Sequence, residues 1–543
     1  MLILAVCCMS LFIVAVDNTI VNIALPAIQR DLHASVSGLQ WTIDAYTLVL
    51  ASLLMLSGST ADRVGRRRTF QVGLVLFTLA SGLCSAAPSL GWLVAFRALQ
   101  AVGGSMLNPV AMSIISNTFT DAKERARAIG VWGGVVGLSM AAGPVLGGLL
   151  VQAVGWRSIF WVNIPVGLAA LVLTALYVPE SRAARARRPD PVGQALVFTV
   201  LASVTYAIIE GPGRGWGSPL ILGLFALAAL SVASLLRYEG RRQDPLIELR
   251  FFKSIPFSGA TIIAVSAFIA LAGFLFLNTL YLQDVRGYSA AKAGLLTLPM
   301  AAVTAVFSPL SGRLVAERGT RFPLLVAGLC IGATGLLLQS LTATTSLLYL
   351  GLVYALFGLG FGVVNAPITN TAVSGMPRSQ SGVAAAVAST SRQVGGSLGV
   401  ALIGTVAVAR VHGSMHDGLS SASHAGWAIL AGCGLIILLL GVLTTTQRAT
   451  RSAERAAALF PDHTLPPEQA LPADHSSATA PPEKIGTNAA DAVALSAEGG
   501  VVDVDPATVE DGLGVGVAPT FPDEPTALTS RVAADASPDT DTR

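Results

Sequence analysis

The sequence predicts an all-α polytopic membrane protein with two six-helix bundles, two extra helices between them, and a disordered C-terminal tail. The first observation is composition: the 543 residues are 53% hydrophobic and 12% charged, and the mean hydropathy is +0.67. Soluble domains carry about 25% charged residues. The second is a series of apolar segments, each near the length of a bilayer-spanning helix. The third is an internal repeat.

Fourteen apolar segments are predicted as spans. They lie near 2–25, 40–58, 70–87, 91–116, 128–154, 158–177, 192–209, 219–236, 257–282, 293–314, 323–341, 346–371, 382–408 and 424–445. The predicted domains are an N-terminal bundle (1–177), cytoplasmic loops with two extra helices (178–256), a C-terminal bundle (257–445) and a disordered acidic cytoplasmic tail (446–543). The first segment has no basic stretch before it, so we interpret it as a retained helix rather than a cleaved signal.

Basic residues predict the orientation. If both termini are cytoplasmic, the cytoplasmic loops and the start of the tail hold 23 Lys and Arg and the outer loops hold 6. Basic residues concentrate on the cytoplasmic side of membrane proteins, which favours this assignment. From Thr446 onward, 16 acids stand against 6 bases, so a basic body precedes an acidic tail.

Similar motifs recur in the same order at offsets of about 250 residues. R-A-L-Q-A-V-G-G-S-M-L-N ends at Asn108, and Y-A-L-F-G-L-G-F-G-V-V-N ends at Asn365. In the next spans, Gly143 and Gly147 correspond to Gly395 and Gly399. Two parallel halves around a substrate path are typical of rocking-bundle transporters.

A single carboxylate, Asp17, interrupts the first span in D-N-T-I-V-N-I-A-L-P. An acid at that depth costs about 2.5–3.5 kcal/mol, and acids kept there are usually functional. Because desolvation favours the neutral form of a carboxylate, we predict a proton carrier. A purely structural network is the alternative. The neighbours Asn18 and Asn22 are one turn apart, where they can bind a partner helix or a cargo.

Charged and polar residues also mark other spans. Arg97, Gln100 and Asn108 share one face of their helix with Gly104, and that face must contact a cavity or polar partners. A structural ion pair is the alternative for Arg97. Asp44, in W-T-I-D-A-Y, is expected just inside the outer end of the second span, where it can meet water. Arg392 lies deep in another span, and we predict that Asn278, Asn365 and Arg392 line the cavity.

The motifs together resemble the major facilitator superfamily, in particular its fourteen-helix drug/proton antiporters. The resemblance covers about residues 1–445. It rests on four stretches: Asp17 to Pro26, G-S-T-A-D-R-V-G-R-R-R from Gly58, F-R-A-L-Q-A-V-G-G from Phe96, and G-L-S-M-A-A-G-P-V-L-G-G from Gly137. The tail and the Ala/Arg-rich composition look like antibiotic self-resistance exporters of high-GC bacteria, including those for aromatic polyketides.

The resemblance implies roles for these residues. Asp17, Asp44 and Arg97 would couple protons, and Gly58, Asp62, Arg63, Gly65 and Arg66 would form a conformational latch between the halves. Gly137, Gly143, Pro144, Gly147 and Gly148 would form the antiporter helix, whose small residues also permit ordinary close packing. Asn18, Asn22, Gln100, Asn108, Asn278, Asn365 and Arg392 are the expected substrate cavity.

We therefore expect a proton-coupled exporter of an amphipathic small molecule in the bacterial inner membrane, conferring antibiotic resistance. It is expected to be a monomer with no enzymatic activity, no cofactor beyond the proton motive force, no metal site and no nucleic-acid partner. No G-x-x-x-x-G-K-[ST] motif for ATP is present. A metabolite importer of the same superfamily and a non-transporting membrane sensor are the alternatives.

Overall fold

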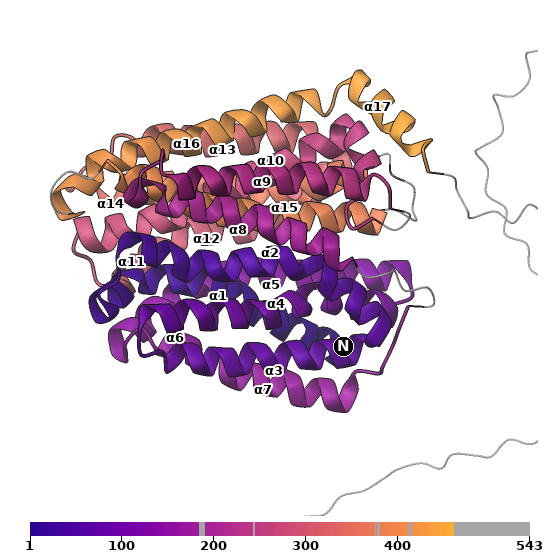
Figure 1. The fold of residues 1–543 in the computed structure, drawn as a ribbon, viewed down its shortest axis with the longest axis horizontal. Coiled ribbons are helices and arrows are strands. Elements are labelled where there is room, and N and C mark those ends of the chain that lie inside the picture. The colour runs from indigo at the N-terminus through magenta and orange to yellow at the C-terminus, as the bar shows by residue number, and fades with distance from the viewer. Residues whose placement is uncertain (184–189, 243–244, 375, 377–380, 411–414, 461–543) are drawn as a thin grey trace, which may run out of the picture. The chain divides into compact units, whose positions relative to one another are not determined.

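A computed structural model describes residues 1–183, 190–242, 245–374, 376, 381–410 and 415–460, and within these ranges every element is a helix (Figure 1). The N-terminal bundle contains α1 (Leu2–Leu32), α2 (Val36–Val64), α3 (Arg66–Ser85), α4 (Leu90–Thr118), α5 (Ala122–Ala153), α6 (Ser158–Trp161) and α7 (Asn163–Tyr177). The extra pair is α8 (Pro191–Arg214) and α9 (Pro219–Glu239).

The C-terminal bundle follows the extra pair. It contains η1 (Leu249–Lys253), α10 (Ile255–Leu280), η2 (Tyr281–Val285), α11 (Ala290–Leu296), α12 (Leu298–Arg318), α13 (Arg321–Leu338), α14 (Leu347–Val373), α15 (Ser381–Val408) and α16 (Met415–Leu443), with α17 (Gln447–Ala457) after it. Within the described residues, twelve helical segments are long and apolar enough to cross a membrane. Helices α5 and α15 occupy the two remaining predicted segments and are not among these twelve.

Capping residues begin several helices where the sequence turns. The hydroxyl of Ser35 accepts the backbone N–H of Gly38 at the start of α2, and Ser346 does the same for Tyr349 at the start of α14. Asp190 caps α8, which has proline in its first turn. Such caps satisfy N–H groups that have no partner within the helix.

The two bundles repeat the same helix pairings. Helix α1 packs on α5 as α10 packs on α15, and α4 packs on α2 and α3 as α14 packs on α12 and α13. In Figure 1 the indigo N-terminal bundle lies beside the orange C-terminal one. The internal repeat in the sequence is therefore a repeat of structure.

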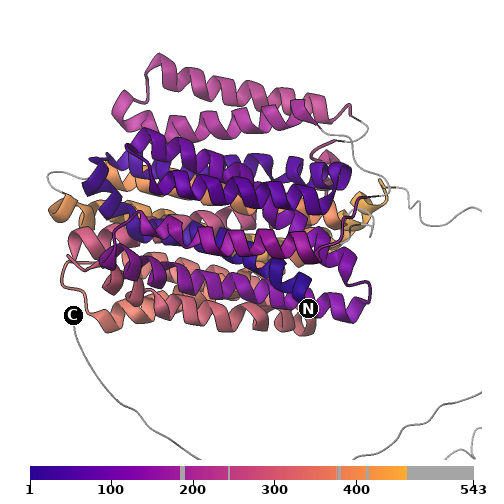
Figure 2. The ribbon, with the colours of Figure 1, turned by 90° about the horizontal axis from the view of Figure 1, so that it is seen from below.

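The extra pair α8–α9 lies on one side of the other helices (Figure 2). Helix α8 contacts α2 of the first bundle and α15 of the second, which also contact each other. The indole N–H of Trp41 on α2 donates to Glu210 on α8 at 3.0 Å, and the Thr405 hydroxyl on α15 donates to the carbonyl of Ile208 at 3.2 Å. The pair thus covers the junction between α2 and α15.

Contacts between the bundles gather at the end opposite Met1. Met1 and α17 lie at one end of the bundles, here called the Met1 end. Near the other end, the side-chain amide of Gln40 donates to the carbonyls of Val400 (3.0 Å) and Ala401 (3.2 Å), and Gln283 donates to the carbonyl of Ile23 (2.8 Å). The two bundles are therefore closed against each other at that end.

The hydrophobic core has the same asymmetry. Between Leu4 and Val14, α1 belongs to a cluster made only of residues from the N-terminal bundle. From Val16 to Ile28 it belongs to a cluster shared by both bundles. The described cavities, of about 410 and 270 Å³, lie at the Met1 end, one against each bundle.

The expectation that the chain is disordered from 446 onward is wrong for its first residues. Thr446 caps α17, and Ala449, Ala453 and Ala456 bury one face of this helix against η1 and α10. Phe460, 8% exposed, packs on Phe251 with ring centroids 5.3 Å apart. The rest of the predicted tail, 461–543, lies outside the described residues.

Candidate functional site

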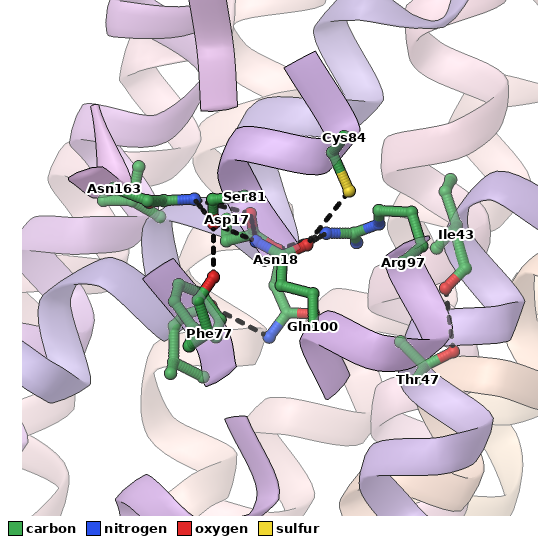
Figure 3. A network of polar contacts seen from close by, with 12 residues as sticks. Asp17, Asn18, Ile43, Thr47, Phe77, Ser81, Cys84, Arg97, Gln100 and Asn163 are labelled. Atoms are coloured by element: carbon green, nitrogen blue, oxygen red, sulfur yellow. Dashed lines mark hydrogen bonds and ion pairs between the residues drawn. The ribbon is translucent and has the colours of Figure 1, made fainter. Parts of the chain in front are cut away.

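The predicted proton carrier is buried at the middle of α1. Asp17 is 0% exposed. Its Oδ2 pairs with Nη1 of Arg97 on α4, and its Oδ1 accepts the side-chain amides of Gln100 and of Asn163 on α7, each at 2.9 Å. The carboxylate thus holds α1, α4 and α7 together (Figure 3).

Arg97 is equally enclosed, with 1% of its side chain exposed. Its Nε donates to the carbonyl of Thr42 at 3.2 Å, and its Nη1 also donates to Oε1 of Gln100 at 2.6 Å. The guanidinium carbon lies 4.2 Å from the ring centroid of Tyr46. A buried ion pair is sustained only with such additional hydrogen bonds.

A second layer of polar groups supports the pair. The hydroxyl of Ser81 on α3 accepts the amides of Gln100 (2.8 Å) and Asn163 (3.3 Å). The thiol of Cys84 lies 4.0 Å from Oε1 of Gln100. The motifs predicted Asp17, Arg97 and Gln100 but missed Ser81 and Asn163; the one signal for Asn163 is an amide within an apolar span.

The geometry links protonation to helix packing. Protonation of Asp17 at either oxygen removes the negative charge that pairs with Arg97. Protonation and the ion pair therefore exclude each other, and a protonated Asp17 leaves Arg97 as a buried charge without a counter-charge. Because that state is costly, a change of protonation favours a different arrangement of α1 and α4.

Asp44 is not near water, contrary to the sequence-based expectation. Its side chain is 0% exposed, its Oδ1 accepts the hydroxyl of Thr47 at 3.4 Å, and Ser397 of α15 lies beside it. Helices α8 and α15 cover this part of α2, which hydropathy could not reveal. Asp44 therefore lies at the junction between the bundles, away from the Asp17 network.

The predicted latch residues lie at the Met1 end of α2 and α3. Asp62 pairs with Arg66 at 2.9 Å, and Arg63 is exposed. A Cβ added to Gly58 would lie 3.9 Å from Cβ of Pro109, which is ordinary van der Waals contact. Gly65 has φ 128°, a conformation that favours glycine. None of these contacts reaches the C-terminal bundle, so the latch between the halves remains a prediction.

The small residues of α5 face two neighbours. A Cβ on Gly147 would lie 2.7 Å from side-chain atoms of Ile20 and Ile23 on α1, and Gly143 faces Thr19 of the same helix. Gly148 faces Ala290 and Ala291 of α11, where Gly294 in turn meets the backbone of Pro144. The small residues of α5 therefore allow close packing against α1 in the same bundle and against α11 of the C-terminal bundle. Gly137 lies on α5, but its surroundings are outside the described residues.

The predicted cavity residues do not form one cluster. Gln100 belongs to the Asp17 network, and Asn278 is buried as the acceptor of the Tyr354 hydroxyl. Asn18, Asn108, Asn365 and Arg392 are half-buried, whereas Asn22 is buried. The side-chain oxygens of Asn22 and Asn108 are buried without a hydrogen-bond partner in the described part of the chain. Within that part, no group of three His, Cys, Asp or Glu side chains is placed to hold a metal ion.

Comparison with known proteins identifies the family. The sequence profile of the Major Facilitator Superfamily matches residues 7–400. The chain belongs to the Major Facilitator Superfamily. It is therefore a multi-pass membrane transport protein and not an enzyme, and it acts on a small molecule.

Similar proteins include several with names that describe drug resistance. The multidrug resistance protein Stp of Mycobacterium tuberculosis is 38% identical over 76% of this chain and 77% of its own. The tetracenomycin C resistance and export protein of Streptomyces glaucescens is 39% identical over 73% of this chain and 74% of its own. The puromycin resistance protein of Streptomyces alboniger is 38% identical over 80% of this chain and 87% of its own.

Solved structures share the fold. The crystal structure of a bacterial homologue of the human lysosomal transporter Spinster, described as inward-facing and unoccupied, superposes with a TM-score of 0.56. It covers 84% of this chain and 97% of its own at 18% identity. At that identity the likeness establishes the fold alone.

Proposed function

We propose that this protein is a proton-coupled efflux transporter that exports an amphipathic antibiotic or toxic metabolite by alternating access. The observation that carries the proposal is the buried Asp17–Arg97 pair, whose formation and protonation exclude each other. The resistance and export proteins at 38–39% identity support export as the direction of transport.

The proposal places fourteen spans in the bacterial inner membrane, with both termini in the cytoplasm. Helices α5 and α15 are the two additional spans, and they continue the repeated pairings of the two bundles. The excess of basic residues in the loops at the Met1 end supports this orientation. In this orientation the closed end faces outward. We propose a monomer with an acidic tail.

Protons supply the energy in this scheme. With the cargo bound from the cytoplasm, the bundles rock and expose the network to the outside, where Asp17 takes up a proton as the cargo leaves. Return to the inward state releases that proton into the cytoplasm. A membrane potential provides about 2.3 kcal/mol per charge per 100 mV, so no ATP site is needed.

Everted vesicles from cells that express the protein test this function. N-phenyl-1-naphthylamine, a fluorescent and uncharged hydrophobic arylamine, serves as the probe. We expect uptake into vesicles whose interior is acidified by respiration, and rapid loss of the probe after nigericin dissipates the pH difference. Uptake that is the same with and without nigericin contradicts proton coupling, and binding without uptake or counterflow favours a sensor. Probe accumulation in intact cells above that of cells without the protein favours an importer.

A further inference from the structure

Two arginines lie deep in the spans, and only one has a counter-charge. Arg97 pairs with Asp17. Arg392 on α15 donates from Nη2 to the hydroxyl of Thr369 on α14 at 2.5 Å, and its Nε is buried with no hydrogen-bond partner among the described residues. No ion pair within the described part of the chain includes Arg392.

Most of the C-terminal bundle contains no acid that could supply the missing charge. From Arg318 to His416 the sequence contains no Asp or Glu, and none lies between Lys253 and Asp284. Arg392 as a whole is half-buried, but its Nε is enclosed. Arginine remains protonated in proteins, and enclosing part of its charge without a counter-charge is costly. The acids of this bundle are Asp284 on η2, Glu317 near the end of α12 and Asp417 near the start of α16, and none of the ion pairs among the described residues joins one of them to Arg392.

The buried acids of the N-terminal bundle are engaged elsewhere. Asp17 is held by three donors in its own bundle. Asp44 faces α15, but it lies beside Ser397 and accepts from Thr47. Neither acid forms an ion pair with Arg392 in this structure.

The surroundings of Arg392 combine polar and apolar groups. Thr369, Asn365 and Phe361 are spaced by four residues, so they share one face of α14. This face runs from an aromatic ring through an amide to the hydroxyl that holds Nη2. A guanidinium fork binds a planar anion through two parallel N–H groups, and the Nε–H of Arg392 has no acceptor among the described residues.

We propose that Arg392 binds the anionic group of the exported compound, which makes the cargo a hydrophobic acid such as a carboxylate, sulfonate or acidic phenolate. This inference rests on the proposed export function and names its substrate class. The cargo neutralises Arg392 on binding, and Thr369 positions the guanidinium for it. A neutral compound of the same shape would lack this contact and bind more weakly.

A matched pair of probes tests the charge requirement. 8-Anilinonaphthalene-1-sulfonate and N-phenyl-1-naphthylamine share one ring system and differ by the sulfonate. Fluorescence titrations use the full chain in nanodiscs, with empty nanodiscs subtracted. We expect the wild type to bind the sulfonate more tightly, and Arg392→Gln to weaken sulfonate binding about tenfold or more while amine binding changes less than about twofold.

Two further variants sharpen this test. Arg392→Lys keeps the charge but loses the fork, so sulfonate affinity falls between that of the wild type and Arg392→Gln. Arg313→Gln removes an exposed arginine of α12 and leaves both affinities unchanged. Retained amine binding shows that each variant is folded.

Specific outcomes overturn the inference. It fails if Arg392→Gln binds the sulfonate as tightly as the wild type does, or if the variant loses both probes in parallel. If the wild type exports the amine under a proton gradient but has no preference for the sulfonate, this inference is wrong and the export function stands. If the wild type neither binds nor transports either probe, both proposals fail.

Discussion

Replacing Asp17 by Asn separates the two consequences of the buried ion pair. The substitution keeps the shape of the side chain but leaves Arg97, 1% exposed, without a counter-charge. Breaking a buried pair from one side costs about 3–5 kcal/mol. We therefore expect the free energy of unfolding to fall by about that amount, and proton-driven export to be lost.

The double variant Asp17→Asn/Arg97→Gln distinguishes stability from coupling. With both charges gone, no buried charge lacks a partner, so most of the lost stability should return while proton-driven export remains absent. Asp31→Asn is the matched control on the same helix. Asp31 pairs with Arg157 at 2.5 Å but is 46% exposed, so this variant should cost about 0–1 kcal/mol and export normally.

Unfolding titrations with SDS in mixed micelles measure the stabilities, and drug resistance of expressing cells measures export. Two results would refute the reasoning. One is an Asp17→Asn protein as stable as the wild type, because Arg97 would then not depend on the carboxylate. The other is unchanged resistance in cells that carry this variant, because Asp17 would then not couple protons.

Three other substitutions test the closed end and the last helix. Gln40→Ala removes the donor to the carbonyls of Val400 and Ala401, two hydrogen bonds that contribute about 1 kcal/mol each. Spin labels at Ser89 and Thr344 should therefore report a larger population in which the bundles are separated at that end. An unchanged distance distribution would contradict a role for Gln40 in holding this end closed. Gly148→Leu should increase the distance between the same labels, because a Cβ at this position would lie 2.8 Å from Cα of Ala291. Gly223→Leu is the control on α9, where an added Cβ meets nothing within 4 Å, and it should leave the distance unchanged. Equal distance distributions for the two variants would show that the contact between α5 and α11 does not help to close this end. Thr446→Ala removes the N-cap of α17 at a cost of about 1 kcal/mol, so amide hydrogen exchange should accelerate in α17 alone. An equal acceleration throughout the C-terminal bundle would show that α17 does not unfold by itself.

Much of the fold could be predicted because a membrane helix can be recognised from its own stretch of sequence. A long apolar run must satisfy its backbone within a helix, which fixes the spans before any packing is known. The repeated glycines predicted an internal repeat, and in the structure α1–α5 and α10–α15 both cross at small residues. The spacing of Arg97 and Gln100 placed them on one face, and the structure brings both to Asp17.

What the sequence could not predict depends on tertiary contacts. Asp44 was expected in water because the sequence gives its position along the span. The sequence does not reveal that α8 and α15 pack over this part of α2. Ser81 and Asn163 are isolated polar residues with no motif around them. Helix α17 buries only small alanines, Ala449, Ala453 and Ala456, and this helical spacing lies in a segment whose polar composition indicated disorder. Whether Asn18, Asn22 and Asn365 contact cargo remains a prediction.

Proton movement during transport tests the central claim most directly. Proteoliposomes containing the full chain would enclose a pH-sensitive dye, and a gradient of N-phenyl-1-naphthylamine would be imposed with the membrane potential clamped by valinomycin and potassium. The account predicts that amine flux through the wild type drives protons in the opposite direction, and that Asp17→Asn abolishes this proton flux. Amine flux at the wild-type rate with no change in internal pH would contradict it.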